Sequence, residues 1–418
     1  MSAGPAIPSG ITRRTLLGSS AAATLVPMRA AAAAAASGAP SLDRGDFAFQ
    51  GNFLNAAYTH PMPRRVGDQI AAFRQDRLTH ADRMWTGDNF RDAAAEQFAG
   101  LVHVRPQDLA IVPSTTTGEN MLLDALGIGP DAGVVTDALH YFGSLALYQQ
   151  KAAAGMPLRI VKPRDFAIDL ADIEAAIDGR TRLIAVSLVS GLTGFTHDLA
   201  ALCRIAHARD VLVYADIIQA AGAMPIDLTA TGVDFACCGS YKWLMGDFGS
   251  AFLYVRPDRM DRLRRRAVGW RQIDDHVTHW LPFDPPGGAD DFTFVPGPAG
   301  LFEVGTPAHA TLASLATSIA ALRAADVERI ARRRKPLIDR LQHELAALGL
   351  TCLSPRDNPS GIATFACRDA GARLRPALKD QGITAQVSTH RVRLSPSSYT
   401  SDEDISQVIA VIGRAMKA

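Results

Sequence analysis

A single lysine, Lys242, stands in an otherwise small and apolar stretch that runs from Gly232 to Gly249. Burying an ammonium group is costly unless the group is paired or loses its proton. A neutral lysine amine is a nucleophile that forms a Schiff base with a carbonyl compound. The stretch therefore indicates either a reactive lysine or, as an equally simple interpretation, a partly exposed lysine at the end of a strand.

An acidic residue upstream favours the reactive lysine. The apolar run 211–215 ends in Asp216, 26 residues before Lys242, and another apolar run, 182–190, precedes it. Both runs predict buried parallel strands, and the first places Asp216 at the carboxyl end of its strand, where ligands bind in open α/β sheets. Pyridoxal phosphate chemistry requires a carboxylate that pairs with a pyridinium nitrogen and a lysine that holds an aldehyde. The predicted cofactor is pyridoxal 5'-phosphate, with Lys242 and Asp216 as the catalytic residues.

Three segments together carry a resemblance to a known family. The strand that ends in Asp216-Ile-Ile-Gln219, the segment Ser240–Leu244 and the segment Phe302–Thr306 resemble the class V aminotransferase family, which includes cysteine desulfurases, kynureninases and isopenicillin N epimerase-like proteins. The resemblance runs from about Asn52 to the C-terminus, with the motifs in the family's order. It implies the α/β fold type I of pyridoxal phosphate-dependent transferases, in which a large, mostly parallel sheet domain carries a smaller α/β C-terminal domain.

The segment after the strand predicted at 109–113 is rich in hydroxyl groups. Residues 114–117 are Ser-Thr-Thr-Thr, and with Gly118 they open a predicted helix. Free N–H groups and the positive end of the helix dipole make such a terminus an anion site, although N-capping alone selects the same residues. The resemblance favours phosphate binding through Thr115 and Thr116, and it adds Ser240 and Tyr241, which flank Lys242, as phosphate ligands.

Two further cofactor contacts follow from the resemblance. In the family the segment that matches Phe302–Thr306 reaches across a dimer interface, which implies a homodimer with shared active sites in which Thr306 binds the phosphate held by the other subunit. Val268-Gly-Trp270 is similar to a kynureninase segment that closes over the phosphate. For Trp270, a surface or core tryptophan is the alternative interpretation.

The resemblance also assigns contacts to the cofactor ring. Tyr141 occupies the position of the aromatic residue that stacks on the pyridine face, with His140 and Phe142 one position away and an ordinary core aromatic as the alternative. Stacking contributes about 0.5–1.5 kcal/mol beyond the buried area. Gln219 stands where kynureninases have histidine, and its amide donates to the phenolate oxygen. Gly191 replaces an asparagine that many members use to reach the cofactor or substrate.

A C-terminal segment supplies the predicted substrate contact. Arg391-Val-Arg393-Leu-Ser resembles the family segment whose arginine grips the α-carboxylate of an amino acid substrate through two parallel hydrogen bonds. Arg393 is the matching residue. Arg391 is the alternative, because it lies two positions away on the same strand face, and a plain surface charge remains open for either arginine.

The length of 418 residues predicts two domains, since single cores stop growing at roughly 250–300 residues. The stretch 271–300 is rich in Asp, Pro and Gly and predicts a long irregular loop. The formal net charge of +1 gives no reason to expect a nucleic-acid partner. The predicted organisation is a signal peptide, an N-terminal segment, a large cofactor-binding domain and a small C-terminal domain, over residues 1–36, 37–63, 64–305 and 306–418.

The N-terminus predicts export. Arg13 and Arg14 form a twin-arginine pattern, the apolar stretch 18–26 follows, and residues 30–36 offer small-residue cleavage sites. The alternative is a disordered, alanine-rich N-terminus. The predicted location is the bacterial periplasm, reached by the twin-arginine route, with no membrane association once the signal is removed. Five irregularly spaced cysteines predict neither a disulfide framework nor a metal site.

These residues predict an enzyme that acts at the α carbon of an amino acid, with aminotransferase or epimerase activity first. The alternatives are a kynureninase-like carbon–carbon lyase and a protein that binds pyridoxal phosphate without turnover. Cysteine desulfurase activity is disfavoured. The family's desulfurases need a nucleophilic cysteine just before the arginine segment, whereas residues 382–393 contain none and Cys367 ends an apolar strand.

Overall fold

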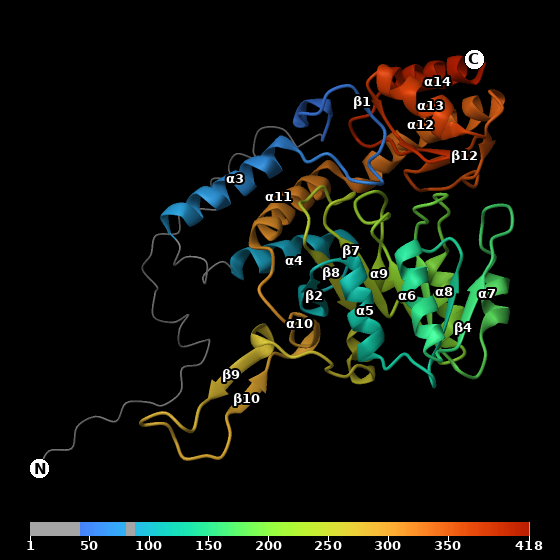
Figure 1. The fold of residues 1–418 in the computed structure, drawn as a ribbon. Coiled ribbons are helices and arrows are strands. Elements are labelled where there is room, and N and C mark those ends of the chain that lie inside the picture. The colour runs from blue at the N-terminus through green and yellow to red at the C-terminus, as the bar shows by residue number, and fades with distance from the viewer. Residues whose placement is uncertain (1–41, 81–87, 418) are drawn as a thin grey trace, which may run out of the picture.

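A seven-stranded sheet forms the centre of the computed structural model, which describes residues 42–80 and 88–417 (Figure 1). The strand order is β2-β8-β7-β6-β5-β3-β4, and only β8 runs antiparallel to its neighbours. The predicted α/β fold with a large, mostly parallel sheet is thereby confirmed. The strands are β2 (Leu109–Val112), β3 (Gly133–Asp137), β4 (Leu158–Val161), β5 (Thr181–Ser187), β6 (Leu212–Asp216), β7 (Phe235–Gly239) and β8 (Ala251–Val255).

Short apolar runs form the inner strands of this sheet. Every residue of β7 and β8 is buried, as expected for strands that have packed side chains on both faces. In the register, Ser187 at the end of β5 lies opposite Asp216 at the end of β6, and Asp216 lies opposite Cys237 of β7. The carboxyl ends of these parallel strands therefore meet at one edge, and the chain leaving β7 reaches Lys242 there.

Helices cover the sheet, and side-chain caps fix where several of them begin. Ser114, Asp169 and Asp198 each accept a hydrogen bond from a backbone N–H in the first turn of the following helix. The helices before α12 are α3 (Arg64–Thr79), α4 (Asp88–Val102), α5 (Thr115–Ala125), α6 (Phe142–Ala153), α7 (Leu170–Ala176), α8 (Leu199–His207), α9 (Leu228–Thr231), α10 (Gly297–Phe302) and α11 (His309–Ala325).

A smaller antiparallel sheet lies in the C-terminal part of the chain, as predicted for a small α/β unit. Its order is β11-β12-β15-β14, and helices α12, α13 and α14 share its hydrophobic core. The elements are β11 (Thr351–Cys352), β12 (Ala363–Ala366), β14 (Gln386–Val387), β15 (Arg391–Leu394), α12 (Val327–Ala347), α13 (Ala370–Asp380) and α14 (Asp402–Lys417).

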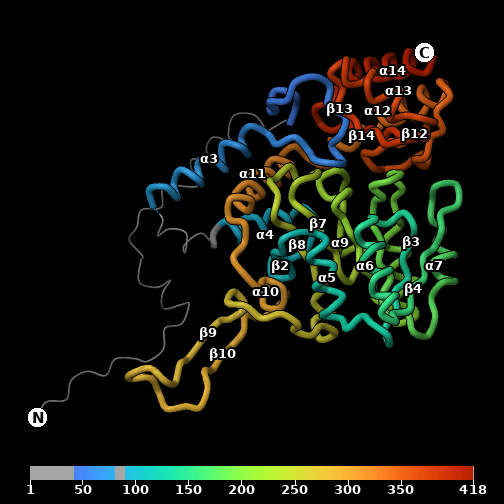
Figure 2. The backbone as a smooth tube through the Cα atoms, in the orientation of Figure 1, coloured from blue at the N-terminus to red at the C-terminus, as the bar shows by residue number. Residues whose placement is uncertain are grey.

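Among the described residues, one hydrophobic core, built of two clusters, surrounds the large sheet, and a second lies in the C-terminal part of the chain. Helix α11 packs against α3 and α4, and its apolar residues belong to the core around the large sheet. The second core begins in α12, at Leu337, and also includes Leu54 near the N-terminus. Strand β1 (Asn52–Phe53) pairs with β13 (Ile383–Thr384), so the N-terminal segment lies beside the C-terminal elements (Figure 2).

The predicted irregular loop at 271–300 contains an antiparallel hairpin. Strands β9 (Ile273–Val277) and β10 (Asp291–Phe294) pair and project away from the large sheet (Figure 1). Among the described residues, no single helix is long and apolar enough to cross a membrane, although α11 and α12, which meet at 71°, satisfy that length and composition test as a pair. The predicted signal peptide, residues 1–36, lies outside the described residues.

Candidate active site

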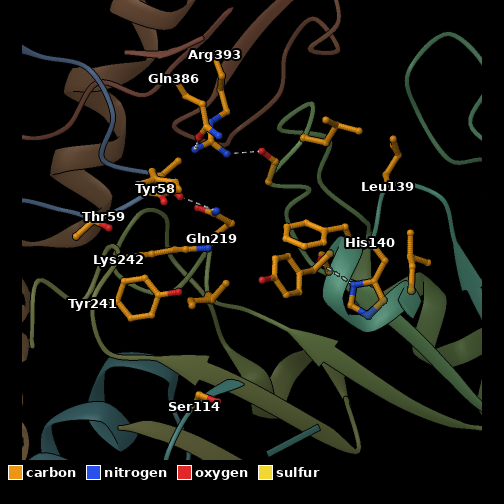
Figure 3. A pocket seen from close by; sticks show the side chains of 18 of the residues that line it. Tyr58, Thr59, Ser114, Leu139, His140, Gln219, Tyr241, Lys242, Gln386 and Arg393 are labelled. Carbon is orange, nitrogen blue, oxygen red and sulfur yellow. Dashed lines mark hydrogen bonds between the residues drawn. The ribbon is translucent and has the colours of Figure 1, made fainter. Parts of the chain in front are cut away.

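A pocket of about 1000 Å³ opens at the carboxyl edge of the large sheet. Three parts of the chain line it: the N-terminal segment around Tyr58, the loops after the large-sheet strands, and strands β14 and β15 of the smaller sheet. Figure 3 shows Gln386 and Arg393 from the smaller sheet facing Lys242 and Gln219 from the larger one. The pocket is therefore formed where the two sheets meet.

Lys242 lies in a tight turn after β7. The backbone N–H of Met245 donates to the Lys242 carbonyl at 2.8 Å, and Gly246 N–H donates to the Ser240 carbonyl at 3.0 Å. Burial lowers the pKa of Lys242 to about 8; the Asp216 charge raises it, and the Arg393 charge adds to the lowering. A lysine with this pKa is partly uncharged at neutral pH, which is the form that attacks carbonyl groups.

Asp216 is only 4% exposed at the end of β6. Burial raises the pKa of its carboxyl group, while the Ile218 N–H, which donates to Oδ1 at 2.9 Å, and the charges of His140 and Lys242 oppose that rise. A buried carboxylate of this kind gains stability from a further cationic partner. A protonated ring nitrogen is such a partner.

The start of α5 leaves hydrogen-bonding groups unused. Ser114 lines the pocket and caps the helix by accepting from Thr117 N–H at 3.0 Å, but the first N–H groups of a helix have no partner within it. Thr115 Oγ1 and Ser250 Oγ are buried without a hydrogen-bond partner among the described residues. A Cβ placed on Gly239 would lie 3.1 Å from Thr115 Oγ1, so this hydroxyl is beside the end of β7.

These groups fit the parts of pyridoxal phosphate. The unpartnered hydroxyls and the α5 N-terminus suit its phosphate, Asp216 suits its ring nitrogen and Lys242 suits its aldehyde. Tyr141, which the sequence places against the ring face, lines the pocket with its side chain 40% exposed.

Gln219 is held on both sides of its amide. Its Nε2 donates to the Ala57 carbonyl and its Oε1 accepts from Trp243 Nε1, each at 2.9 Å. The amide orientation is therefore fixed by these partners, and Gln219 lines the pocket beside Lys242 (Figure 3).

Six of the predicted cofactor contacts lie outside the pocket lining: Thr115, Thr116, Asp216, Ser240, Trp270 and Thr306. Ser240 is buried with its hydroxyl donating to the Asp247 carbonyl, and Thr116 is exposed at the start of α5. Thr306 is exposed, and Trp270 is 46% exposed. Tyr241, in contrast, lines the pocket, with the Lys242 Nζ 6.0 Å from its ring centroid.

Ser250 and Gln386 are pocket residues that the sequence did not reveal. Ser250 directly precedes β8, and Gln386 begins β14. The Gly249-Ser250 pair at the start of an apolar run was an available signal for Ser250. Gln386 carried no signal, because the partner of its side chain, Arg393, lies on a neighbouring strand.

Arg393 is a mostly buried cation that faces the pocket from β15. Its Nη1 donates to the Gly191 carbonyl and its Nη2 to Gln386 Oε1, each at 2.5 Å. Burial lowers the pKa of Arg393 to about 10, so the guanidinium remains charged at neutral pH. No carboxylate among the described residues pairs with it, whereas Arg391 also lines the pocket but is exposed.

Comparison with known proteins shows the family of the chain. The family profile described as "Aminotransferase class-V" matches residues 53–407. A kynureninase of Shouchella clausii is 27% identical over 342 residues, 78% of either chain. A probable cysteine desulfurase of Methanothermobacter thermautotrophicus is 24% identical over 320 residues, 75% of this chain and 77% of that protein.

Solved structures share the fold. A C-DES mutant with glycine covalently linked to the PLP cofactor superposes with a TM-score of 0.78 and 20% identity, over 89% of this chain and 99% of the other. An apo cysteine desulfurase of Thermococcus onnurineus gives a TM-score of 0.75 at 21% identity, over 88% and 95%. The predicted fold type I is confirmed. The chain belongs to the class V aminotransferase family of pyridoxal phosphate enzymes.

Proposed function

We propose that this protein is an aminotransferase or an epimerase that acts at the α carbon of an amino acid. One observation carries the proposal: Lys242, whose pKa is about 8, and Arg393, a partly buried cation without an acidic partner in the described chain, face the same pocket. An α-amino acid presents an amine and a carboxylate at one carbon. The pocket offers a group for each.

Each side chain has a defined task in this proposal. Bound pyridoxal phosphate supplies an aldehyde that condenses with amines and a ring that accepts the electron pair left at Cα. Arg393 orients the substrate carboxylate, and Asp216 keeps the ring nitrogen protonated. The freed Lys242 amine accepts the Cα proton and holds it at Nζ until it is returned.

The destination of that proton distinguishes the two activities. Transamination needs Lys242 alone as base and acid, whereas epimerisation needs a proton donor for the opposite face of Cα. The hydroxyl groups of Tyr58, Tyr141 and Tyr241 line the pocket and are the candidates for that donor.

A kynureninase-like carbon–carbon lyase is the second candidate. It is favoured by the kynureninase relative and by a pocket wall that contains the aromatic side chains of Tyr58, Phe142 and Phe248. Gln219 weighs against it, because kynureninases have histidine at that position. Cysteine desulfurase activity has less support still, because no cysteine is among the described residues that line the pocket.

We also propose a homodimer with shared active sites. Thr306 and Trp270 are exposed and lie outside the pocket lining of their own chain, and their segments are adjacent, since a Cβ on Gly269 would lie 2.2 Å from the Val304 carbonyl oxygen. Export to the bacterial periplasm by the twin-arginine route is proposed from residues 1–36 alone. Fusion of these residues to a reporter that is active only after export tests that route.

A substrate panel tests the proposed activity. The purified protein is incubated with L- and D-amino acids, with and without a keto acid, and with kynurenine. Formation of the pyridoxamine form indicates transamination, deuterium uptake with inversion at Cα indicates epimerisation, and alanine release from kynurenine indicates the lyase. The Lys242→Ala variant is the control and should lose the yellow colour. A yellow protein that changes none of these compounds would instead be a cofactor-binding protein without turnover.

A further inference from the structure

A chain of buried polar side chains leads from the pocket wall into the large domain. His140 lines the pocket but is 4% exposed, and its Nδ1 lies 2.8 Å from Ser187 Oγ. On the other side of the ring, Nε2 lies 3.5 Å from Oε1 of Glu119, which is 1% exposed. Glu119 Oε2 accepts from Ser144 Oγ at 2.6 Å, and Oε1 accepts from the Tyr148 hydroxyl.

Glu119 accepts hydrogen bonds at both of its oxygens. One hydroxyl group donates to each oxygen, which is the acceptor-only pattern of a carboxylate. A buried carboxylate is stabilised by a nearby positive charge. Among the described residues, His140 is the basic side chain within 4.0 Å of Glu119.

The surroundings of His140 are acidic on several elements. Glu119 faces it from α5, Asp137 from β3 and Asp216 from β6, while the Tyr148 ring lies 6.0 Å away on α6. Burial lowers the pKa of His140, but the Glu119 carboxylate 3.5 Å away, helped by the charges of the two aspartates, outweighs burial and raises it above its ordinary value. Asp137 already pairs with His197 at 3.1 Å, which leaves Glu119 as the direct partner.

The protonation state of His140 determines whether the Ser187 hydroxyl accepts or donates in its hydrogen bond with Nδ1. A protonated imidazole carries N–H on both nitrogens, so Nδ1 donates to Ser187 Oγ and the serine proton is free for another acceptor. In a neutral ring with its proton on Nε2, Nδ1 would instead accept a hydrogen bond from the serine hydroxyl. Ser187 lines the pocket and lies opposite Asp216 in the β5–β6 register.

We propose that Glu119 and His140 form a buried ion pair that positions the Ser187 hydroxyl as a hydrogen-bond donor at the Asp216 end of the pocket. The positive charge of His140 also opposes the rise in the Asp216 pKa, and so helps to keep Asp216 ionised for the ring nitrogen of the cofactor. Glu119 itself does not line the pocket, so it acts through His140 and is a positioning residue. The inference concerns cofactor electrostatics and does not depend on which reaction the enzyme catalyses.

Histidine side-chain NMR of the ¹⁵N-labelled, cofactor-free protein tests the ion pair directly. The His140→Gln variant identifies the signals of His140. In the unaltered protein these signals should keep the doubly protonated pattern to a higher pH than ordinary histidine, and Glu119→Gln should lower that pH by at least one unit. A neutral His140 below pH 6.5, or a midpoint unchanged in Glu119→Gln, would overturn the proposal.

The affinity for pyridoxal phosphate tests whether the Glu119–His140 pair supports cofactor binding. Glu119→Gln should weaken pyridoxal phosphate binding by roughly tenfold in an absorbance titration. Ser144→Ala, which removes one hydrogen bond to Glu119 but keeps its charge, should weaken binding less. His207→Gln is the matched control, because it breaks the 2.9 Å His207–Asp234 pair outside the pocket and leaves Asp234 with Arg256 and Arg259.

Thermal unfolding distinguishes a folded variant that has lost cofactor affinity from a variant that no longer folds. If Glu119→Gln is unfolded, His140→Asn and Ser187→Ala interrupt the same chain from the pocket side and should weaken cofactor binding in its place. If folded Glu119→Gln and His207→Gln bind pyridoxal phosphate with equal affinity, the Glu119–His140 pair does not support cofactor binding. A failure of the amino acid panel would leave both the NMR result and the affinity result interpretable, so the two proposals fail independently.

Discussion

At the scale of single residues, the two cations of the pocket influence one another. Arg393 is charged at neutral pH, and its field adds to burial in lowering the pKa of Lys242. The site therefore combines a permanent cation, suited to a carboxylate, with an amine that loses its proton near neutrality. The low pKa of Lys242 depends on burial at the junction of the two sheets, whereas Arg393 keeps its charge in spite of burial.

Cofactor loading should depend on pH through Lys242. The neutral amine is the reactive form, so the rate at which the cofactor-free protein acquires pyridoxal phosphate should rise with pH and level off above about 8. Arg393→Gln removes a positive charge and should shift this midpoint upward. Stopped-flow absorbance measures the rate, and Arg391→Gln, at an exposed arginine, is the control. A midpoint near that of free lysine in the unaltered protein would contradict the assigned environment.

Substrate binding should distinguish the two arginines of β15. Arg393→Lys keeps the charge but loses the planar fork, so KM for the amino acid substrate should rise by roughly ten- to a hundredfold, about 1.4–2.8 kcal/mol. Arg391→Lys should change KM by less than about threefold, because Arg391 is exposed. Steady-state kinetics on the substrate found in the panel provide the comparison. The reverse order would move the carboxylate contact to Arg391.

At the scale of elements, the N-terminus of α5 is positioned by its own cap and by its neighbour strand. Ser114 caps the helix, and β2 delivers it to the same edge as the end of β7. Thr115 then places a buried, unpartnered hydroxyl beside Gly239. An isolated helix terminus would offer only backbone donors there.

Loss of this hydroxyl should affect the phosphate selectively. Thr115→Val should raise the Kd for pyridoxal phosphate by roughly five- to tenfold, about 1–1.4 kcal/mol, and leave the Kd for pyridoxal unchanged. Thr317→Val, within α11, is the control, since that hydroxyl bonds only to the Ala313 carbonyl of its own helix. An equal loss for both ligands would assign Thr115 a structural role.

Segment 302–306 is anchored by a buried acid. Glu303 Oε1 accepts from Arg91 Nη2 at 2.6 Å and from Ile111 N–H at 3.0 Å, so the segment is tied to β2. Thr306 follows this anchor and is exposed. The anchor fixes the direction in which Thr306 is presented to a second subunit in the proposed dimer.

At the scale of the whole molecule, the shared active site can be tested by mixing subunits. Lys242→Ala and Thr306→Trp each damage one half of the proposed composite site, so each homodimer should lose most of its activity. Refolding the two variants together should restore about a quarter of the activity of the unaltered enzyme, because half of the dimers are mixed and each has one intact site. Absence of recovery in verified mixed dimers would remove Thr306 from the site of the other subunit.

His60 connects the N-terminal segment to the turn that contains Trp243 and to the C-terminal segment 397–399. It is buried, its Nε2 lies 2.7 Å from Ser397 Oγ, and its ring packs near Trp243 and Tyr399, so it is a core residue and does not line the pocket. Burial lowers its pKa to about 4. The stability that its neutral form provides is complete above pH 6.5 and is lost as the pH falls through 4.

Because of His60, the free energy of unfolding should decrease at acid pH. Between pH 6.5 and 4, the unaltered protein should lose up to about 3 kcal/mol more unfolding free energy than His60→Gln, since one pKa unit corresponds to about 1.4 kcal/mol. Urea unfolding at several pH values measures the difference. His343→Gln is the control for a general histidine effect, because His343 is exposed on α12. Parallel pH profiles for the unaltered protein and His60→Gln would exclude this role.

Most of the large sheet could be predicted from the sequence, because apolar runs and helix caps are properties of neighbouring residues. The run that ends in Asp216 forms β6, and the hydroxyl-rich segment after β2 opens α5. The hairpin at β9 and β10 was missed, since the surrounding Asp, Pro and Gly residues indicate a loop and only the four residues of β10, Asp291–Phe294, alternate between polar and apolar.

The sequence by itself determined the fold class and the cofactor, and it predicted Lys242 and Asp216 as the reactive pair, because each depends on residue types within short, ordered segments. Only the tertiary structure decided that Ser250 lines the pocket while the Ser240 hydroxyl is used by the Asp247 carbonyl, and that Glu119 lies against His140. Such contacts depend on strand order and on side-chain direction. The chain brings these groups together only when its two sheets have packed.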